Sequence, residues 1–185
     1  MSDYGGSTTP PEHRDSWRTP PELFAALNAE FCFQLDAAAS EENHLCNMWI
    51  GEEQNCLTAN WANDFFMERA YAWLNPPYSN IGPFVRKAAD ENKWASVGVV
   101  MLVPADTSVG WFREAIETAS EVRFITGGRL AFVNAVTGKP VSGNNKGSML
   151  IIWHPWPRTH CAFSTIERDQ LMGFGSKVIG RREAA

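Results

Sequence analysis

The sequence predicts an α/β protein built on a mostly parallel central sheet with an antiparallel hairpin at one edge. Segments with strand-like patterns alternate with segments of helical periodicity, which is typical of parallel sheets. Residues 97–103 form a continuous apolar run, as expected for a central strand covered on both faces. The last strand-like segments follow one another without a helix and predict the hairpin.

The individual elements follow from local signals along the chain. The first helix is predicted to begin with Thr19 as its N-cap, because prolines follow and Glu22 completes a capping box. A short strand is expected over residues 33–37, and residues 48–50 are a weaker strand candidate. The remaining predicted elements are a strand at 70–74, a helix at 83–92, a strand at 97–103, a helix capped near Ser108, and strands at 121–125, 130–133 and 149–153.

The length of 185 residues predicts one domain. We expect residues 1–15 to be a flexible N-terminal arm, residues 16–160 a single domain, and residues 161–185 a basic C-terminal tail. Before Val122 the chain has 7 Lys and Arg against 18 Asp and Glu, whereas from Val122 onward it has 9 against 3. This asymmetry favours a partner with negative charge, such as nucleic acid; the alternative is a solvated basic end.

Composition excludes several classes of protein. Hydrophobic residues make up 44% and charged residues 20%, which argues against disorder and coiled coils. No apolar run approaches the roughly 20 residues that a membrane span needs, and no secretory signal is visible, so we expect a cytoplasmic protein without membrane association. The four cysteines show no metal-binding spacing with the histidines, which predicts buried free thiols and no metal.

A turn with unusual chemistry follows the predicted strand at 70–74. Asn75-Pro76-Pro77-Tyr78 ends that strand with two residues that lack an N–H and fix φ. Outward carbonyl oxygens, the Asn75 side-chain oxygen and the flat Tyr78 ring suit a planar amine such as the exocyclic amino group of a nucleobase. Because ligands of such sheets bind at the carboxyl ends of strands, this turn is the first candidate for a functional site; a simple proline-rich turn is the alternative.

The quartet resembles the catalytic motif of S-adenosylmethionine-dependent amino-methyltransferases. A wider pattern consists of the segments Asp15-Ser16-Trp17-Arg18-Thr19-Pro20, Phe31 to Asp36-Ala37-Ala38-Ala39, Leu57 to Trp61, Asn75 to Tyr78, and Trp111-Phe112. Over residues 15–155 this pattern resembles the phage-type DNA N6-adenine methyltransferase (phage Dam) family, which implies a Rossmann-like fold.

The resemblance implies a cofactor site for S-adenosylmethionine, with S-adenosylhomocysteine as the product and no metal. Asp36 would face the methionine amino group beside Ala37; a surface or helix-capping aspartate is the alternative. The other implied cofactor residues are Trp17, Thr19, Asn60 and Trp61. The glycine-rich loop of the wider superfamily is absent, since Ala37 to Glu41 stand in its place, and only Glu52 and Glu53 are candidates for the ribose hydroxyls.

The predicted partner is double-stranded DNA. A flipped adenine would stack on Tyr78, with Phe132 as the candidate for the other face, although Phe132 equally fits a core strand. Contacts to phosphates and base edges are expected from Lys139, Asn144 and Lys146, and phosphate contacts from Lys177, Arg181 and Arg182; solvated loop and tail are the alternatives.

The function predicted on these grounds is methyl transfer to the N6 amino group of adenine in duplex DNA, in host cytoplasm if the chain is phage-encoded. One alternative keeps the fold and cofactor but methylates RNA guanine or protein glutamine. Another is a DNA-binding relative without catalytic activity. The pattern leaves the recognised DNA site and the oligomeric state open.

Overall fold

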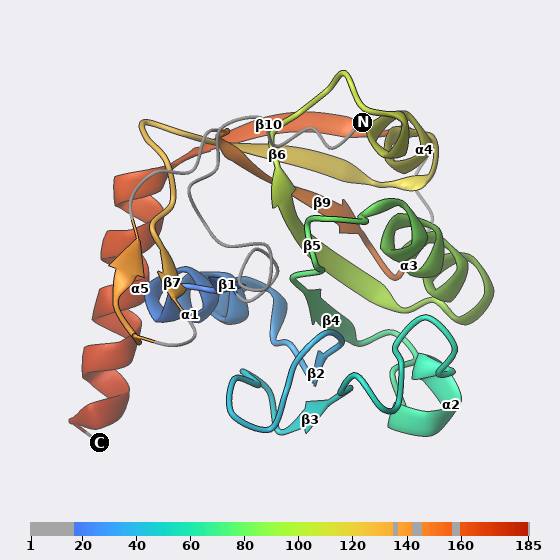
Figure 1. Cartoon of the computed structure of the whole chain (residues 1–185), viewed down its shortest axis with the longest axis horizontal. Helices are drawn as coiled ribbons and strands as arrows, with labels where there is room; N and C mark the ends of the chain where they lie inside the picture. Colours follow the sequence, from blue (N-terminus) through green and yellow to red (C-terminus); the bar gives the residue numbers. More distant parts are fainter. Residues whose placement is uncertain (1–16, 135–136, 142–145, 157–159, 185) are drawn as a thin grey trace.

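A seven-stranded sheet runs through the centre of the molecule (Figure 1). The structure is a computed structural model that describes residues 17–134, 137–141, 146–156 and 160–184. The strands of this sheet are β2 (Leu35–Asp36), β3 (Met48–Trp49), β4 (Tyr71–Leu74), β5 (Gly98–Pro104), β6 (Glu121–Thr126), β9 (Ser148–Trp153) and β10 (Ala162–Glu167). Their order across the sheet is β10-β6-β9-β5-β4-β2-β3.

The mostly parallel sheet is confirmed, but its one reversed strand lies inside the sheet and not at the expected edge. Strand β9 pairs antiparallel with β5 on one side and with β6 on the other. All six residues of β9 are buried, which explains its position, since an apolar strand without polar alternation needs cover on both faces and both edges.

Three short strands form a second, antiparallel sheet beside the first. They are β1 (Trp17–Arg18), β7 (Phe132–Asn134) and β8 (Pro140–Val141), in the order β1-β7-β8. The strand predicted at 130–133 is therefore present, but it begins two residues later and ends one residue later, and it belongs to this small sheet. The pairing joins the start of the described chain to a segment more than a hundred residues away.

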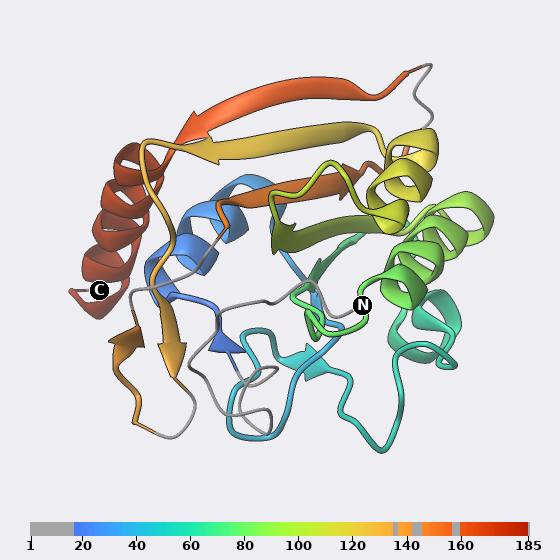
Figure 2. The ribbon, with the colours of Figure 1, turned by 45° about the horizontal axis from the view of Figure 1, so that its top comes forward.

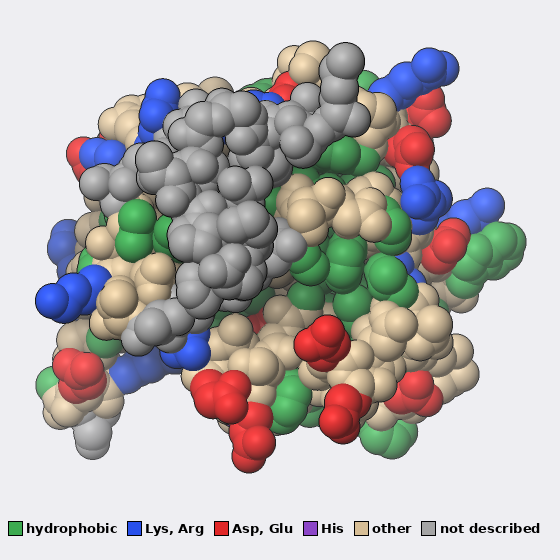
Figure 3. Space-filling view, in the orientation of Figure 1, with side chains coloured by type: hydrophobic (Ala, Val, Ile, Leu, Met, Phe, Trp, Pro, Cys, Tyr) green, Lys and Arg blue, Asp and Glu red, His purple; other side chains and the backbone are tan. Residues whose placement is uncertain are grey.

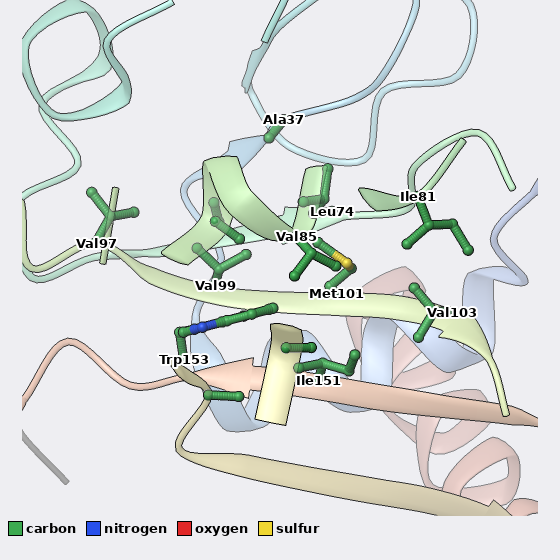
Figure 4. Packing of buried hydrophobic residues seen from close by; sticks show 14 of the residues in the cluster. Ala37, Leu74, Ile81, Val85, Val97, Val99, Met101, Val103, Ile151 and Trp153 are labelled. Atoms are coloured by element: carbon green, nitrogen blue, oxygen red, sulfur yellow. The ribbon is translucent and has the colours of Figure 1, made fainter. Parts of the chain in front are cut away.

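Helices cover both faces of the central sheet (Figure 2). The helices are α1 (Pro21–Phe31), α2 (Trp61–Phe65), α3 (Gly82–Ala95), α4 (Gly110–Thr118) and α5 (Arg168–Glu183). Alternate residues of the central strands enter two apolar clusters, one beneath α1 and α5 and the other beneath α2, α3 and α4. Figure 4 shows the second cluster, in which Met101, Ile151 and Trp153 pack between sheet and helices.

Helix α1 begins differently from the prediction. Pro20 occupies the N-cap position, no side chain caps the helix, and the N–H of Phe24 donates to the Pro20 carbonyl at 3.1 Å. The capping box from Thr19 to Glu22 is therefore wrong. Thr19 is instead 6% exposed in the connection between β1 and α1.

The segment from Cys161 is part of the domain and not a basic tail. Strand β10 pairs in parallel with β6, and α5 packs along α1. Contact between these helices is close at Gly175, where an added Cβ would clash with the Glu22 carbonyl oxygen. The charge of the last third of the chain hid this structure, because α5 carries basic residues along its length, with Arg181 and Arg182 in its last turn.

Two of the four cysteines behave as the sequence predicts. All four are free, and burial raises the pKa of Cys46 to about 12 and that of Cys56 to about 11, so both stay as inert thiols. Cys32, however, is exposed at the end of α1. Within the described ranges, no helix has the length and apolar character to cross a membrane.

Candidate active site at the carboxyl edge of the sheet

Asp36 and Asn75 lie at the same edge of the central sheet, at the ends of adjacent strands. Asp36 ends β2 and pairs with Trp73 of β4, and the N–H of Ala37 donates to the Trp73 carbonyl at 2.9 Å. Asn75 directly follows β4, two residues beyond Trp73. Because alternate strand residues face the same side, both side chains project from the face that α1 covers.

The Asp36 carboxylate is buried with few compensating groups. It is 3% exposed, and its Oδ2 accepts a hydrogen bond from the backbone N–H of Leu45 at 3.0 Å. Burial raises the pKa of Asp36 from 3.8 to about 6, against hydrogen bonds from the backbone of Leu45 and Ala38. At neutral pH the group is mostly ionised, so a cationic ligand group beside it would be favoured.

The Asn75 side chain has a fixed donor and a vacant acceptor. Its Nδ2 donates to the backbone carbonyl of Trp17 at 3.3 Å. Its Oδ1 is buried and accepts no hydrogen bond within the part of the chain that the structure describes. Buried acceptors of this kind are rare and costly, and they concentrate where a ligand supplies the missing donor.

Tyr78 and Phe132 meet at the same edge. The chain turns away from the sheet through buried Pro76 and partly exposed Pro77, which leaves the Tyr78 ring edge-on to Phe132 with ring centroids 6.0 Å apart at 87°. The structure thus brings these two predicted residues together. Phe132 is only 2% exposed within the core, so in this arrangement its faces are already covered.

The small sheet connects this edge to the N-terminal segment. Trp17 pairs with Asn134 and Arg18 with Val133. This pairing places the predicted segment around Trp17 and Thr19 beside Asn75. The sequence marked this segment but assigned no role to the Trp17 carbonyl or to Arg18, whose Nε is buried without a hydrogen-bond partner among the described residues. Backbone groups carry no residue signature, and a single arginine in a polar segment is unremarkable.

Asn60 and Trp61 do not join this group. Asn60 caps α2 by accepting from the N–H of Asn63 at 3.1 Å. Trp61 is fully buried, and its N–H donates to Glu91, which lies in the second half of α3. Since α3 begins just after the Asn75–Tyr78 turn and ends just before β5, this half of the helix lies toward the opposite edge. In that position the Trp61 ring has no free surface for a ligand.

The predicted DNA contacts differ in their surroundings. Lys139 is exposed on the loop between β7 and β8. Lys146, in contrast, forms an ion pair with Asp106 beyond the end of β5, and this hydrogen bond helps to lower the pKa of Asp106 to about 2. Asn144 lies outside the described residues. The predicted ribose candidates Glu52 and Glu53 are exposed in the turn after β3.

A seven-stranded, mostly parallel sheet with helices on both faces and polar groups at its carboxyl edge is the Rossmann-like fold of methyltransferases. Comparison with known proteins shows which family of methyltransferases the chain belongs to. The family model for DNA N-6-adenine-methyltransferase (Dam) matches residues 6–178, and the chain belongs to this family.

Phage proteins are among the similar relatives. A DNA N-6-adenine-methyltransferase of Escherichia phage T1 is 41% identical over 164 residues, which cover 80% of this chain and 66% of the relative. One of Haemophilus phage HP1 (strain HP1c1) is 38% identical over 151 residues, covering 80% of this chain and 84% of the relative. A putative methyltransferase, YfdM, of Escherichia coli (strain K12) is 34% identical over 65 residues, which cover 35% of this chain and 71% of the relative.

Proposed function

We propose that the chain transfers a methyl group to the N6 amino group of adenine in duplex DNA, with S-adenosylmethionine as the donor. Membership of the Dam family and the names of the two phage relatives support the reaction class. The observation that carries the proposal is the buried, vacant Oδ1 of Asn75 at the carboxyl edge of the sheet.

Asn75 and Pro76 are the proposed acceptors for the adenine amino group. The N6 lone pair is delocalised into the ring, which makes this nitrogen a poor nucleophile. Hydrogen bonds from its two hydrogens to the Asn75 Oδ1 and the Pro76 carbonyl would favour a tetrahedral nitrogen and stabilise the positive charge that develops there. By analogy with oxyanion-hole donors, removal of one such group costs on the order of 10²–10³-fold in rate.

Asp36 is the proposed partner of the cofactor's ammonium group. A buried carboxylate with a pKa raised to about 6 fits a cationic group, because the opposite charge would offset its desolvation. Ala37, the next residue, is fully buried, and its side chain packs in the apolar cluster beneath α2, α3 and α4, so any contact with the cofactor would come from its backbone. Trp17 and Thr19 would line the same cofactor site. When bound, S-adenosylmethionine supplies a methyl group on a sulfonium, and S-adenosylhomocysteine remains.

Tyr78 is the proposed stacking surface for an adenine flipped out of the duplex. Flipping costs a few kcal/mol, and one stacked ring returns roughly 1–3 kcal/mol. The covered faces of Phe132 favour a different part for this residue: it supports the Tyr78 ring through a contact at an interplanar angle of 87°. Stacking of a base on Phe132 itself would require the two rings to separate.

Phosphate contacts are proposed for exposed basic residues on one side of the molecule. In Figure 3, Lys and Arg side chains lie along the side formed by α5 and the β7–β8 hairpin and also over α3 and α4, whereas Asp and Glu gather over β2, β3 and α2. The exposed candidates are Lys139, Lys177, Arg181 and Arg182. Lys146 is a weaker candidate, because Asp106 already compensates its charge.

The test is transfer from methyl-labelled S-adenosylmethionine to unmethylated duplex DNA, followed by digestion and mass spectrometry of the nucleosides. We expect label in N6-methyladenine, lost in Asn75→Ala and retained in Asn63→Ala, which removes an exposed asparagine on α2. Label in RNA or protein alone would overturn the proposed substrate. Absence of any transfer and of cofactor binding would leave a DNA-binding relative.

A further inference from the structure

We propose that the backbone carbonyl of Trp17 orients the Asn75 side chain, so that position 75 works as an amide and not as a carboxylate. This assigns strand β1 a positioning role in the active site. The inference rests on the proposed function, because it concerns the acceptor that Asn75 offers to the adenine amino group.

The side-chain amide of asparagine has two unlike ends. Its NH2 group only donates hydrogen bonds, and its oxygen only accepts them. The Asn75 Nδ2 is directed to the Trp17 carbonyl oxygen at 3.3 Å. The Oδ1 is therefore left for a donor, and within the described residues none is present. If the Asn75 amide turned over, two donors would face the adenine amino group and two oxygens would face each other at Trp17.

The fold holds the Trp17 carbonyl from several sides. Trp17 and Arg18 pair with β7, and the Trp17 side chain packs against the apolar cluster beneath α1. Thr19 is 6% exposed, and α1 begins two residues later at Pro21. The carbonyl is thus part of a short paired strand that leads directly into α1, whose inner face is buried.

Aspartate at position 75 would meet a different situation. A carboxylate has two acceptor oxygens, and one of them would face the Trp17 carbonyl oxygen at hydrogen-bond distance. Only the protonated acid could donate to Trp17 and present its other oxygen to the substrate. Repulsion between the two oxygens, together with burial, would raise the pKa of an aspartate at this position. The side chain in Asn75→Asp would therefore have to be protonated to act as the native asparagine does.

The first test compares methyl transfer by Asn75→Asp with that of the native chain between pH 6 and 8.5, at saturating cofactor. We expect Asn75→Asp to be slower by about 10²-fold or more at pH 8.5. Its rate relative to the native chain should rise as the pH falls, by up to about tenfold per unit. Asp36 titrates in both chains, so the ratio removes its common effect on the rate. Asn75→Ala should be equally slow at every pH, and a flat ratio for Asn75→Asp would overturn the inference.

The second test measures the melting temperature and needs no activity. Asn75→Asp should melt at a lower temperature than the native chain, and this difference should shrink as the pH falls from 8.5 to 6. The reason is that a carboxyl group whose pKa is raised in the folded state destabilises the fold less once it is protonated. Asn28→Asp is the matched control, since the Asn28 Oδ1 accepts from the N–H of Phe33 at 2.8 Å and a carboxylate can do the same. No shrinking deficit for Asn75→Asp, or an equal one for Asn28→Asp, would overturn the inference.

The two tests separate this inference from the proposed function. If Asn75→Ala methylated DNA at the native rate, the proposed acceptor would be wrong, whereas the melting experiment would still report on the contact with Trp17. If Asn75→Ala were inactive and both pH profiles of Asn75→Asp were flat, Asn75 would remain an acceptor and the orienting role of Trp17 would be wrong.

Discussion

The two edges of the central sheet treat their buried polar groups in opposite ways. At the amino edge, the Tyr71 hydroxyl and His154 Nδ1 share a hydrogen bond of 2.6 Å, and the N–H of His154 donates to Ser120 at 3.0 Å. Arg123 donates to Glu121 at 2.9 Å. At the carboxyl edge, the Asn75 Oδ1 accepts nothing within the described chain, and Asp36 is buried with a raised pKa.

The comparison separates stability from function. A satisfied network of buried polar groups rigidifies a structure, whereas a buried group without a partner destabilises it unless a ligand binds there. Both edges belong to the same strands and the same core, so the difference does not reflect a general looseness of packing. The carboxyl edge keeps unsatisfied groups in the position where Rossmann-like sheets bind their ligands.

The largest expected effect is on catalysis at the carboxyl edge. Asn75→Ala removes the vacant acceptor, and single-turnover methyl transfer should fall on the order of 10²–10³-fold. The free energy of unfolding should change by about 1 kcal/mol or less, because only one hydrogen bond, to Trp17, is lost. A quenched single-turnover assay measures the rate of methyl transfer, and urea unfolding measures the free energy of unfolding. A large loss of stability together with a native rate of methyl transfer would mean that Asn75 serves stability and not catalysis.

Asp36→Asn should change how stability depends on pH. The folded pKa of Asp36 is raised to about 6, so the stabilisation from its protonated form is present below pH 4 and lost as the pH rises through 6. The advantage of Asp36→Asn in unfolding free energy should therefore grow by about 2 kcal/mol from pH 4 to pH 7. Affinity for S-adenosylhomocysteine should fall in the same variant. A constant difference across this pH range would contradict the burial of an ionised group.

Tyr71→Phe tests the amino edge. The change removes the hydroxyl that bonds to His154 and should destabilise the fold by about 1–2 kcal/mol, since His154 Nδ1 then lacks this partner. Methyl transfer by the folded fraction should stay at the native rate. Thermal unfolding and the single-turnover assay check the two expectations. A rate loss beyond the loss of folded protein would mean that this edge also serves catalysis.

The smallest expected effect concerns the surface of α5. Lys177→Ala removes an exposed cation from the side proposed to contact phosphates. The slope of log affinity for duplex DNA against log salt should become shallower by about 0.9. Glu183→Ala, at the end of the same helix, should leave the slope unchanged or steeper. An unchanged slope for Lys177→Ala would place the DNA elsewhere.

Local patterns predicted the frame of the molecule. Apolar runs identified the central strands, and the Asn75-Pro76-Pro77-Tyr78 turn marked where the functional edge would lie. These signals work because a buried strand and a double proline each constrain the backbone through their own side chains. The apolar run of β9 fits a strand inside the sheet, but its antiparallel direction between β5 and β6 left no such signal, since strand order and direction depend on pairing between distant segments.

The details of the site were less accessible. The orientation that leaves the Asn75 Oδ1 available depends on the hydrogen bond of Nδ2 to the backbone carbonyl of Trp17, 58 residues away. A backbone carbonyl has no residue signature. Trp61 matched the wider pattern, but its role in the core beside Glu91 emerges only when α2 and α3 pack. Basic composition likewise concealed β10 and α5, which have few buried residues: none in β10, and Leu171 and Gly175 in α5.

The measurement that tests the central claim most directly is the titration of the Asp36 carboxyl carbon by NMR, with and without S-adenosylhomocysteine. The free protein should show a pKa of about 6 for Asp36. On binding, the ammonium group of the ligand should lower this pKa, because an opposite charge favours the carboxylate. An ordinary pKa in the free protein, or one that saturating ligand leaves unchanged, would contradict the assignment of the carboxyl edge as the cofactor site.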